Sequence, residues 1–333
     1  MSEGSKRGDK QRHSSLPWFL NRFSRADLRE HVEGTRADIE RQVHARKAQL
    51  DATNERITAR TGRNLIFAIG IGLVAGALVI LSLIFIKELF LLFGAALVGF
   101  ASFELAQAFR QGGRPVPRIP TVIVAVGVVP ATFFYGAAGQ LVALVVGITG
   151  IVIWVFVSHV PEQDRSRSRS IRVQTITWSI LVQMYVTLLA SFAILLLAGH
   201  GGEWWVLGFV IVVVAVDTGA YVSGLTWGKH PMAPSISPKK TWEGFAGAAL
   251  AAFIAAVLVS LFMIHMPVWF GLIMGAVLLL TATMGDLVES LIKRDLGIKD
   301  MSSWLPGHGG LLDRLDSILP SAAATYILFL IFT

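Results

Sequence analysis

The sequence of 333 residues contains no cysteine and few charged residues. The absence of cysteine excludes disulfides, thiolate catalysis, cysteine-ligated zinc and iron–sulfur clusters. Charged residues make up only 15% of the chain, whereas hydrophobic residues make up 54%. That balance is too apolar for a soluble globular protein and is typical of a polytopic membrane protein. No signal peptide is evident, since the first long apolar run begins only near Asn64.

Basic charge is concentrated at the N-terminal end. Residues 1–63 carry fourteen Lys and Arg against nine Asp and Glu. A basic surplus can indicate nucleic acid as a partner, but in so apolar a chain it mostly marks the cytoplasmic side of a membrane, so we expect no nucleic acid. Within this tail, about 25–58 carries a narrow apolar stripe that predicts a cytoplasmic amphipathic helix. That helix either dimerises or regulates the protein, or only rests on the protein or the membrane surface.

Nine apolar segments occupy the remaining residues, 64–333, and each approaches the roughly 20 residues that a membrane-spanning helix needs. They predict an all-α polytopic integral membrane protein in which about nine transmembrane helices form one catalytic domain. Glycines in these helices are expected to allow close packing rather than to act as hinges. The expected spans are 64–86, 89–109, 119–136, 139–158, 174–198, 204–224, 244–265, 267–292 and 317–333.

Loop charges predict the orientation of these helices. The loops 110–118, 159–173, 225–243 and 293–316 hold fourteen Lys and Arg between them, whereas the alternate loops hold only Lys87. Because basic loops remain in the cytoplasm, the N-terminus and these four loops are expected to lie there. We therefore predict a multi-pass protein of the cell (plasma) membrane, with any active site built from those loops facing the cytoplasm.

The most unusual stretch runs from Gly285 to Asp316, where ten of thirty-two residues are charged in an otherwise apolar chain. Asp286, Glu289 and Lys293 are spaced so that they share one face of a helix, directly after a long apolar run. Carboxylates at the end of such a run are costly in a membrane. They are therefore candidates for function.

The same stretch combines acidic, basic and glycine-rich features. Carboxylates suit a hard cation, basic side chains suit phosphate, and glycines permit close approach of the backbone to a ligand. The mixture predicts metal-assisted chemistry on a phosphorylated substrate, in which the glycine-flanked histidine donates to phosphate or transfers a proton. The residues concerned are Lys293, Arg294, His308, Asp313, Arg314 and Asp316.

Two further carboxylates interrupt apolar spans. Asp217 follows the run 210–216 and shares a helical face with Tyr221, which indicates a place where a polar group approaches closely. Asp217 either binds a metal or substrate, which we favour, or pairs with a basic residue of another helix. Glu104 either completes a polar site or pairs with a cytoplasmic arginine such as Arg110.

The loop 228–244 offers hydroxyls and ammonium groups close together. Its three prolines exclude a continuous helix. Adjacent lysines suit polyphosphate as mobile point charges, although two lysines beside a membrane can also serve only to set topology. In a rigid loop with several hydroxyls they favour phosphate binding. The residues are Ser237, Lys239, Lys240 and Thr241.

Several common enzyme signatures are absent from the sequence. The lysine loop is not a Walker A motif, no Gly-x-Ser-x-Gly elbow is present, and no histidine has a partner at zinc-ligand spacing. These absences argue against an ordinary P-loop NTPase, a serine hydrolase of the elbow type and a zinc site.

The stretch 290–316 resembles the signature of the phosphatidate cytidylyltransferases, also called CDP-diacylglycerol synthases. The segments 237–244 and 217–221 are similar to that family as well. The resemblance covers about 64–333 and leaves out the N-terminal tail. The matching signature positions are Ser290, Lys293, Arg294, Lys299, Asp300, Ser302, Leu305, Pro306, His308, Gly309, Gly310, Asp313, Arg314 and Asp316.

The resemblance implies transfer of CMP from CTP to phosphatidic acid in phospholipid biosynthesis, with CDP-diacylglycerol and pyrophosphate as products and Mg²⁺ as cofactor. The lipid phosphate can be its own nucleophile, so the lack of cysteine is no obstacle. One alternative is a CTP-dependent polyprenol or phytol kinase, and another is an ion-coupled transporter that would leave the lysine and histidine loops unused. A monovalent cation beside Mg²⁺ and a homodimer are left open.

The resemblance also implies roles for individual residues. Asp217 and Asp286 are the leading metal ligands, with Asp313 as a third, because carboxylates favour Mg²⁺ over zinc. Lys239 and Lys240 are expected to hold the β- and γ-phosphates. The groups expected to orient the lipid phosphate or the α-phosphate are Lys293, Arg294, His308 and Arg314. The other substrate-binding candidates are Tyr221, Ser237, Thr241 and Asp316.

Overall fold

The computed structural model describes residues 76–78, 80–158, 165–298, 301–302 and 310–333. All of these lie in one compact unit, 67–333. The predicted tail with its amphipathic helix and most of the first predicted span lie outside the described residues, as does His308. The division into a tail and a catalytic membrane domain therefore stays a prediction.

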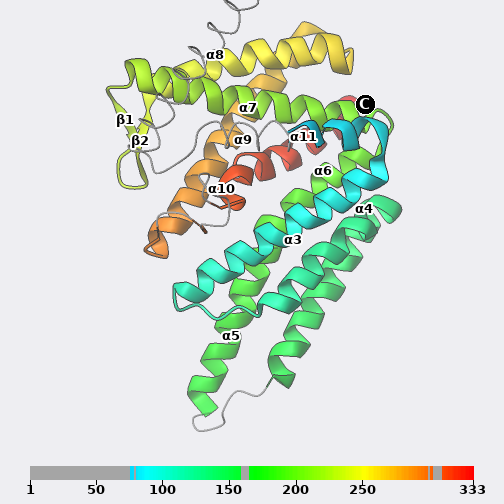
Figure 1. The fold of residues 1–333 in the computed structure, drawn as a ribbon, viewed down its shortest axis with the longest axis vertical. Helices are drawn as coiled ribbons and strands as arrows, with labels where there is room; N and C mark the ends of the chain where they lie inside the picture. The colour runs from blue at the N-terminus through cyan, green and yellow to red at the C-terminus, as the bar shows by residue number, and fades with distance from the viewer. Residues whose placement is uncertain (1–75, 79, 159–164, 299–300, 303–309) are drawn as a thin grey trace, which may run out of the picture. The chain divides into compact units, whose positions relative to one another are not determined.

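The described chain is almost entirely helical (Figure 1). Seven helical segments among the described residues are long and apolar enough to cross a membrane. The protein is thus an all-α polytopic membrane protein, while the number nine and the orientation remain predictions. The elements are α3 (Lys87–Gln111), α4 (Arg118–Val157), α5 (Arg165–Val182), the π-helical turn η2 (Gln183–Leu188), α6 (Leu189–Ala198), α7 (Gly202–Trp227), β1 (Pro231–Ala233), β2 (Ser237–Thr241), α8 (Trp242–Val259), the π-helical turn η3 (Ser260–Ile264), α9 (Val268–Asp295), α10 (Leu312–Leu315) and α11 (Ile318–Phe332).

Helix α4 contains two of the predicted spans, 119–136 and 139–158. Gly136 interrupts it with φ 62° and ψ −149°, a backbone conformation that glycine adopts far more readily than other residues. A Cβ added to Gly147 would lie 2.3 Å from Val124 Cγ1, although these residues would be about 34 Å apart in a continuous helix. The two arms of α4 therefore fold back on each other and correspond to the two predicted segments.

Helices α7 and α8 run side by side and pack closely through small residues (Figure 1). A Cβ on Gly247 would lie 2.0 Å from Ser223 Oγ, and one on Gly219 would lie 2.7 Å from Ala251 Cβ. Small residues allow two backbones to approach, which is how helices associate in lipid. The glycines here serve packing, as the sequence predicted.

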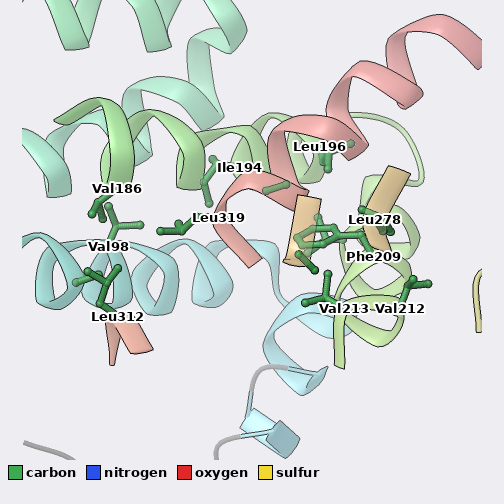
Figure 2. Packing of buried hydrophobic residues seen from close by; sticks show 14 of the residues in the cluster. Val98, Val186, Ile194, Leu196, Phe209, Val212, Val213, Leu278, Leu312 and Leu319 are labelled. Carbon is green, nitrogen blue, oxygen red and sulfur yellow. The ribbon is translucent and has the colours of Figure 1, made fainter. Parts of the chain in front are cut away.

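A continuous apolar core links the helices (Figure 2). Figure 2 shows Val98 of α3 near Val186 of η2, and Phe209 of α7 near Leu278 of α9, with Leu319 of α11 also in the core. Many large apolar side chains on the outer helix faces are exposed, as expected for surfaces that contact lipid. The core fixes α7, α9 and α11 relative to one another, and α7 and α9 carry residues of the site.

The loop between α7 and α8 forms a two-stranded antiparallel hairpin, β1–β2. Its prolines exclude a continuous helix, as predicted, but the hairpin itself was not predicted. Glu243 in the first turn of α8 accepts hydrogen bonds from the backbone N–H groups of Lys229 (3.0 Å) and His230 (3.2 Å). These bonds connect the residues just before β1 to the first turn of α8, just after β2. The two lysines of β2 therefore lie in a segment that is held at both ends.

Candidate active site

A pocket of about 590 Å³ lies between α7, the β1–β2 hairpin, α9 and α10. Eleven of the thirteen site residues proposed from the sequence line it. From α7 and the hairpin come Asp217, Tyr221, Ser237, Lys239, Lys240 and Thr241. From α9, α10 and the residue after α10 come Asp286, Lys293, Asp313, Arg314 and Asp316.

Carboxylates from three separate segments face this pocket. Asp217 comes from α7, Asp286 from α9 and Asp316 from the end of α10. Lys240 Nζ lies 2.6 Å from Asp286 Oδ2, and Ser317 Oγ donates to Asp217 Oδ1 at 3.4 Å. The Asp286 carboxylate therefore already holds a cationic group on the pocket wall.

Lys293 pairs with two carboxylates, Glu289 of its own helix α9 and Asp313 of α10. Its ammonium lies 2.5 Å from Glu289 Oε2 and 2.9 Å from Asp313 Oδ1. The side chains are 16% exposed for Lys293, 1% for Glu289 and 11% for Asp313. Asp313 Oδ2 also accepts from the backbone N–H groups of Gly310 (2.8 Å) and Met301 (3.3 Å). One largely buried ion-pair cluster thus fixes the end of the signature segment against α9.

Glu289 was a candidate for function from the sequence but received no catalytic or binding role there; it lines the pocket and is fully buried. The signal that identified it is its position four residues before Lys293, on the helical face that also carries Asp286. The sequence placed these three residues on one face, and the structure does the same.

Arg294 lies outside the set of pocket-lining residues. Its Nε donates to the carbonyl oxygen of Ile236, in the turn of the hairpin, at 3.2 Å. Thr241 lines the pocket and also caps α8, since its Oγ1 accepts from the backbone N–H of Gly244 at 3.1 Å. Both residues hold the lysine hairpin in place.

Close approach of two backbones brings the ends of the charged stretch together. A Cβ added to Gly285 would lie 2.2 Å from the carbonyl oxygen of Asp316 and 2.7 Å from Pro320 Cγ. Only glycine permits this contact, because a backbone oxygen cannot move aside without displacing its helix. The position of Asp316 beside α9 therefore depends on Gly285.

Replacing Gly285 with alanine is expected to destabilise the protein by about 1–3 kcal/mol, the usual cost of overpacking. The thermal unfolding midpoint of the detergent-purified protein measures this effect. Gly127→Ala is the matched control, because a Cβ there meets nothing within 4 Å and the residue lies within a helix. An unchanged midpoint for Gly285→Ala would contradict the close approach.

The donor set of the pocket fits Mg²⁺ better than zinc. Among the described residues no group of three His, Cys, Asp or Glu is arranged to hold a metal ion. Mg²⁺ usually takes one or two protein carboxylates and completes its shell with substrate phosphates and water, whereas an all-protein cage is unusual for it. Asp217 of α7 and Asp286 of α9 line the same pocket, with Lys240 beside Asp286, and match that pattern.

The fold and the pocket define an integral membrane protein with a polar site for a phosphorylated substrate. The model of the cytidylyltransferase family matches residues 66–332. A phosphatidate cytidylyltransferase of Mycobacterium bovis is 38% identical over 278 residues, which are 81% of this chain and 90% of that protein. One of Mycobacterium leprae is 40% identical over 276 residues, 81% of this chain and 88% of that protein. One of Staphylococcus epidermidis is 44% identical over 119 residues, 35% of this chain and 46% of that protein.

The chain therefore belongs to the cytidylyltransferase family and is a nucleotidyltransferase. The match spans all of the described part of the chain except its last residue, Thr333. It agrees with the resemblance found from the signature residues.

Proposed function

We propose that this protein is a phosphatidate cytidylyltransferase, which transfers CMP from CTP to phosphatidic acid and releases pyrophosphate. The observation that carries the proposal is one pocket in a membrane protein that combines carboxylates of α7 and α9 with lysines of β2 and α9. Relatives that bear this name support it. The relatives described above support this reading over the kinase and the transporter alternatives.

The reaction is an in-line displacement at phosphorus. An oxygen of the lipid phosphate attacks the α-phosphorus of CTP, and the bond from that phosphorus to the oxygen bridging to the β-phosphate breaks. The electron pair of that bond leaves with pyrophosphate. Because the lipid phosphate is already an anion, no residue has to remove a proton. The protein acts mainly by positioning the two phosphates and by neutralising charge.

The pocket residues divide this work. Lys239 and Lys240 hold the β- and γ-phosphates as mobile ammonium groups, and Lys240 exchanges its contact with Asp286 for one with phosphate. Asp217 and Asp286 would hold Mg²⁺, with Asp313 as a further candidate; the ion, when bound, supplies charge neutralisation at the phosphates. We propose no site for a monovalent cation.

The remaining basic groups orient the reacting phosphates. Lys293 and Arg314 line the pocket and face the lipid phosphate or the α-phosphate. Arg294 orients the lysine hairpin through the carbonyl of Ile236. His308, outside the described residues, keeps its predicted role as a phosphate donor or proton-transfer group.

The substrates reach the pocket from two sides. Tyr221 lines the pocket and is 69% exposed on the outer surface of α7, which supports sideways entry of a diacyl lipid from the membrane. The hairpin loop and the signature loop are basic, so we propose that they face the cytoplasm, where CTP is present, and that the membrane is the plasma membrane.

Labelled CTP tests the proposed function directly. With phosphatidic acid and Mg²⁺, purified protein is expected to transfer label from [α-³²P]CTP into lipid and to leave label from [γ-³²P]CTP in pyrophosphate. Excess EDTA is expected to abolish transfer, because the triphosphate charge is then not neutralised.

Each alternative gives a different distribution of label. A polyprenol or phytol kinase would place the γ-label in lipid and would require a lipid alcohol as acceptor. A transporter would place neither label in lipid. Either result would overturn the proposed function.

A further inference from the structure

Glu104 is a carboxylate in the middle of an apolar helix that does not line the pocket. It lies in α3 and is only 2% exposed. Burying a carboxylate is costly unless hydrogen-bond donors surround it, and inside a membrane it is usually retained for a function. Its partners therefore indicate what it does.

Among the described residues, the hydrogen-bond partners of Glu104 belong to the signature segment. Its Oε1 accepts from Ser302 Oγ at 2.5 Å and from the backbone N–H of Leu311 at 2.9 Å. Its Oε2 accepts from the backbone N–H of Leu312 at 2.8 Å. Arg110, the partner considered from the sequence, donates instead to the carbonyl oxygen of Val116 at 3.3 Å. Glu104 thus completes a polar site rather than a pair with that arginine.

These contacts fix the start of α10 from outside the pocket. Leu311 and Leu312 directly precede Asp313 and Arg314, which line the pocket. Asp313 holds the same turn from the pocket side, through the backbone N–H of Gly310. The turn is therefore held between two carboxylates, and only one of them belongs to the pocket.

The fit around this turn is tight. A Cβ added to Gly310 would lie 3.1 Å from Glu104 Oε2 and 3.2 Å from Asp313 Oδ2. Such distances are shorter than ordinary van der Waals contact, so the two carboxylates leave no room for a side chain at position 310, and their hydrogen bonds hold the backbone of the turn directly. A change at Glu104 is therefore transmitted to the groups that face the substrate.

We propose that Glu104 is a positioning residue that sets the place of Asp313 and Arg314 in the pocket through its hydrogen bonds to Leu311 and Leu312. The inference rests on the proposed function for its kinetic consequence. The structural part does not depend on the substrate. Glu104 contributes no group to the substrate itself, since it lies outside the pocket lining.

Removing the Glu104 carboxylate distinguishes a positioning role, which affects kcat, from a binding role, which affects KM. Glu104→Ala is expected to lower kcat for CDP-diacylglycerol formation about 100-fold, the effect of a displacement of about 1 Å in a reacting site. The KM for CTP is expected to stay within about threefold, because the groups on α7, β2 and α9 do not contact Glu104. Glu104→Gln keeps one acceptor oxygen but turns an amide N–H₂ towards a donor, so its kcat is expected to lie between those of wild type and Glu104→Ala.

Ser102→Ala is the matched control. Ser102 lies on the same helix, is fully buried, and its hydroxyl has no hydrogen-bond partner among the described residues. Its kcat is expected to equal that of wild type. A wild-type kcat in Glu104→Ala, or an equal loss in Ser102→Ala, would overturn the inference. If Glu104→Ala does not accumulate in membranes, Glu104→Gln decides by the same criteria.

A thiol reporter tests the structural part without any substrate. Because the chain has no cysteine, Ser317→Cys introduces a single thiol two residues after α10, at a position that is 2% exposed. Adding Glu104→Ala is expected to raise its rate of maleimide labelling at least about tenfold, since the turn before it opens more often. An unchanged rate would overturn the inference. If wild type makes no CDP-diacylglycerol but the labelling rate rises, the proposed function fails and the positioning role stands.

Discussion

Replacing Asp286 with asparagine is expected to lower the rate of CDP-diacylglycerol formation about 10²–10³-fold, the usual effect of removing one charged group that stabilises a developing charge. Asparagine has nearly the same shape, so α9 remains packed, but it offers no negative charge to a cation. Lys240 also loses its partner on the pocket wall. Initial rates at saturating CTP, phosphatidic acid and Mg²⁺ measure the effect, and the amount of protein in the membrane fraction is expected to be unchanged.

The same substitution elsewhere on α9 provides a control. Asp295 lies at the end of this helix and pairs with Arg114, outside the pocket. Because exposed pairs contribute about 0–1 kcal/mol, Asp295→Asn is expected to keep nearly the full rate. Asp217→Asn is expected to behave like Asp286→Asn. Near-normal rates in both pocket variants would remove the assignment of a metal to these carboxylates.

The parts of the site that follow from local spacing could be predicted from the sequence. Asp286 and Lys293 lie on one pocket wall because helical periodicity alone puts them on one face. The separation of α4 into two arms also followed from local composition, since two apolar segments, each close to spanning length, follow one another there at 119–136 and 139–158. In both cases the structural feature is determined by residues that are close together in the sequence.

Features that depend on contacts between distant segments could not be predicted. Nothing near Glu104 in the sequence indicates that its partners lie about two hundred residues later. Arg294 has the charge of a phosphate ligand, but it contacts Ile236 in the β1–β2 hairpin. No alternation of apolar and polar residues in the sequence predicts that hairpin. Such partners are chosen by tertiary packing, which a single sequence does not specify locally.

The pocket is a polar cavity held open by packing that is itself apolar. Gly285 lets α9 approach the segment after α10, and the core residues of α7 and α9 fix the distance between the Asp217 and Asp286 helices. The carboxylates on separate helices therefore do not have to attract one another to stay together. Their mutual repulsion is reduced instead by Lys240 and Lys293, which lie within the same lining.

Replacing Lys293 with methionine is expected to destabilise the protein by about 3–5 kcal/mol, because it leaves a buried carboxylate without its cation. Among the described residues, Lys293 is the only cation paired with Glu289, and no backbone N–H donates to that carboxylate. The unfolding midpoint in a detergent titration measures the loss. Lys240→Met is the control, since its partner Asp286 is 36% exposed and water can replace the ammonium there.

A second substitution distinguishes loss of charge balance from loss of packing. In Lys293→Met combined with Glu289→Gln, no unpaired charge remains at Glu289, while Asp313 keeps its backbone donors from Gly310 and Met301. The double variant is therefore expected to regain most of the stability, because uncompensated charge, not volume, causes the penalty. It is not expected to regain turnover, since the ammonium that we propose orients a substrate phosphate is still absent. A double variant as unstable as Lys293→Met would mean that Lys293 stabilises the fold through its aliphatic stem, and the ion-pair cluster would then not be what holds α10 against α9.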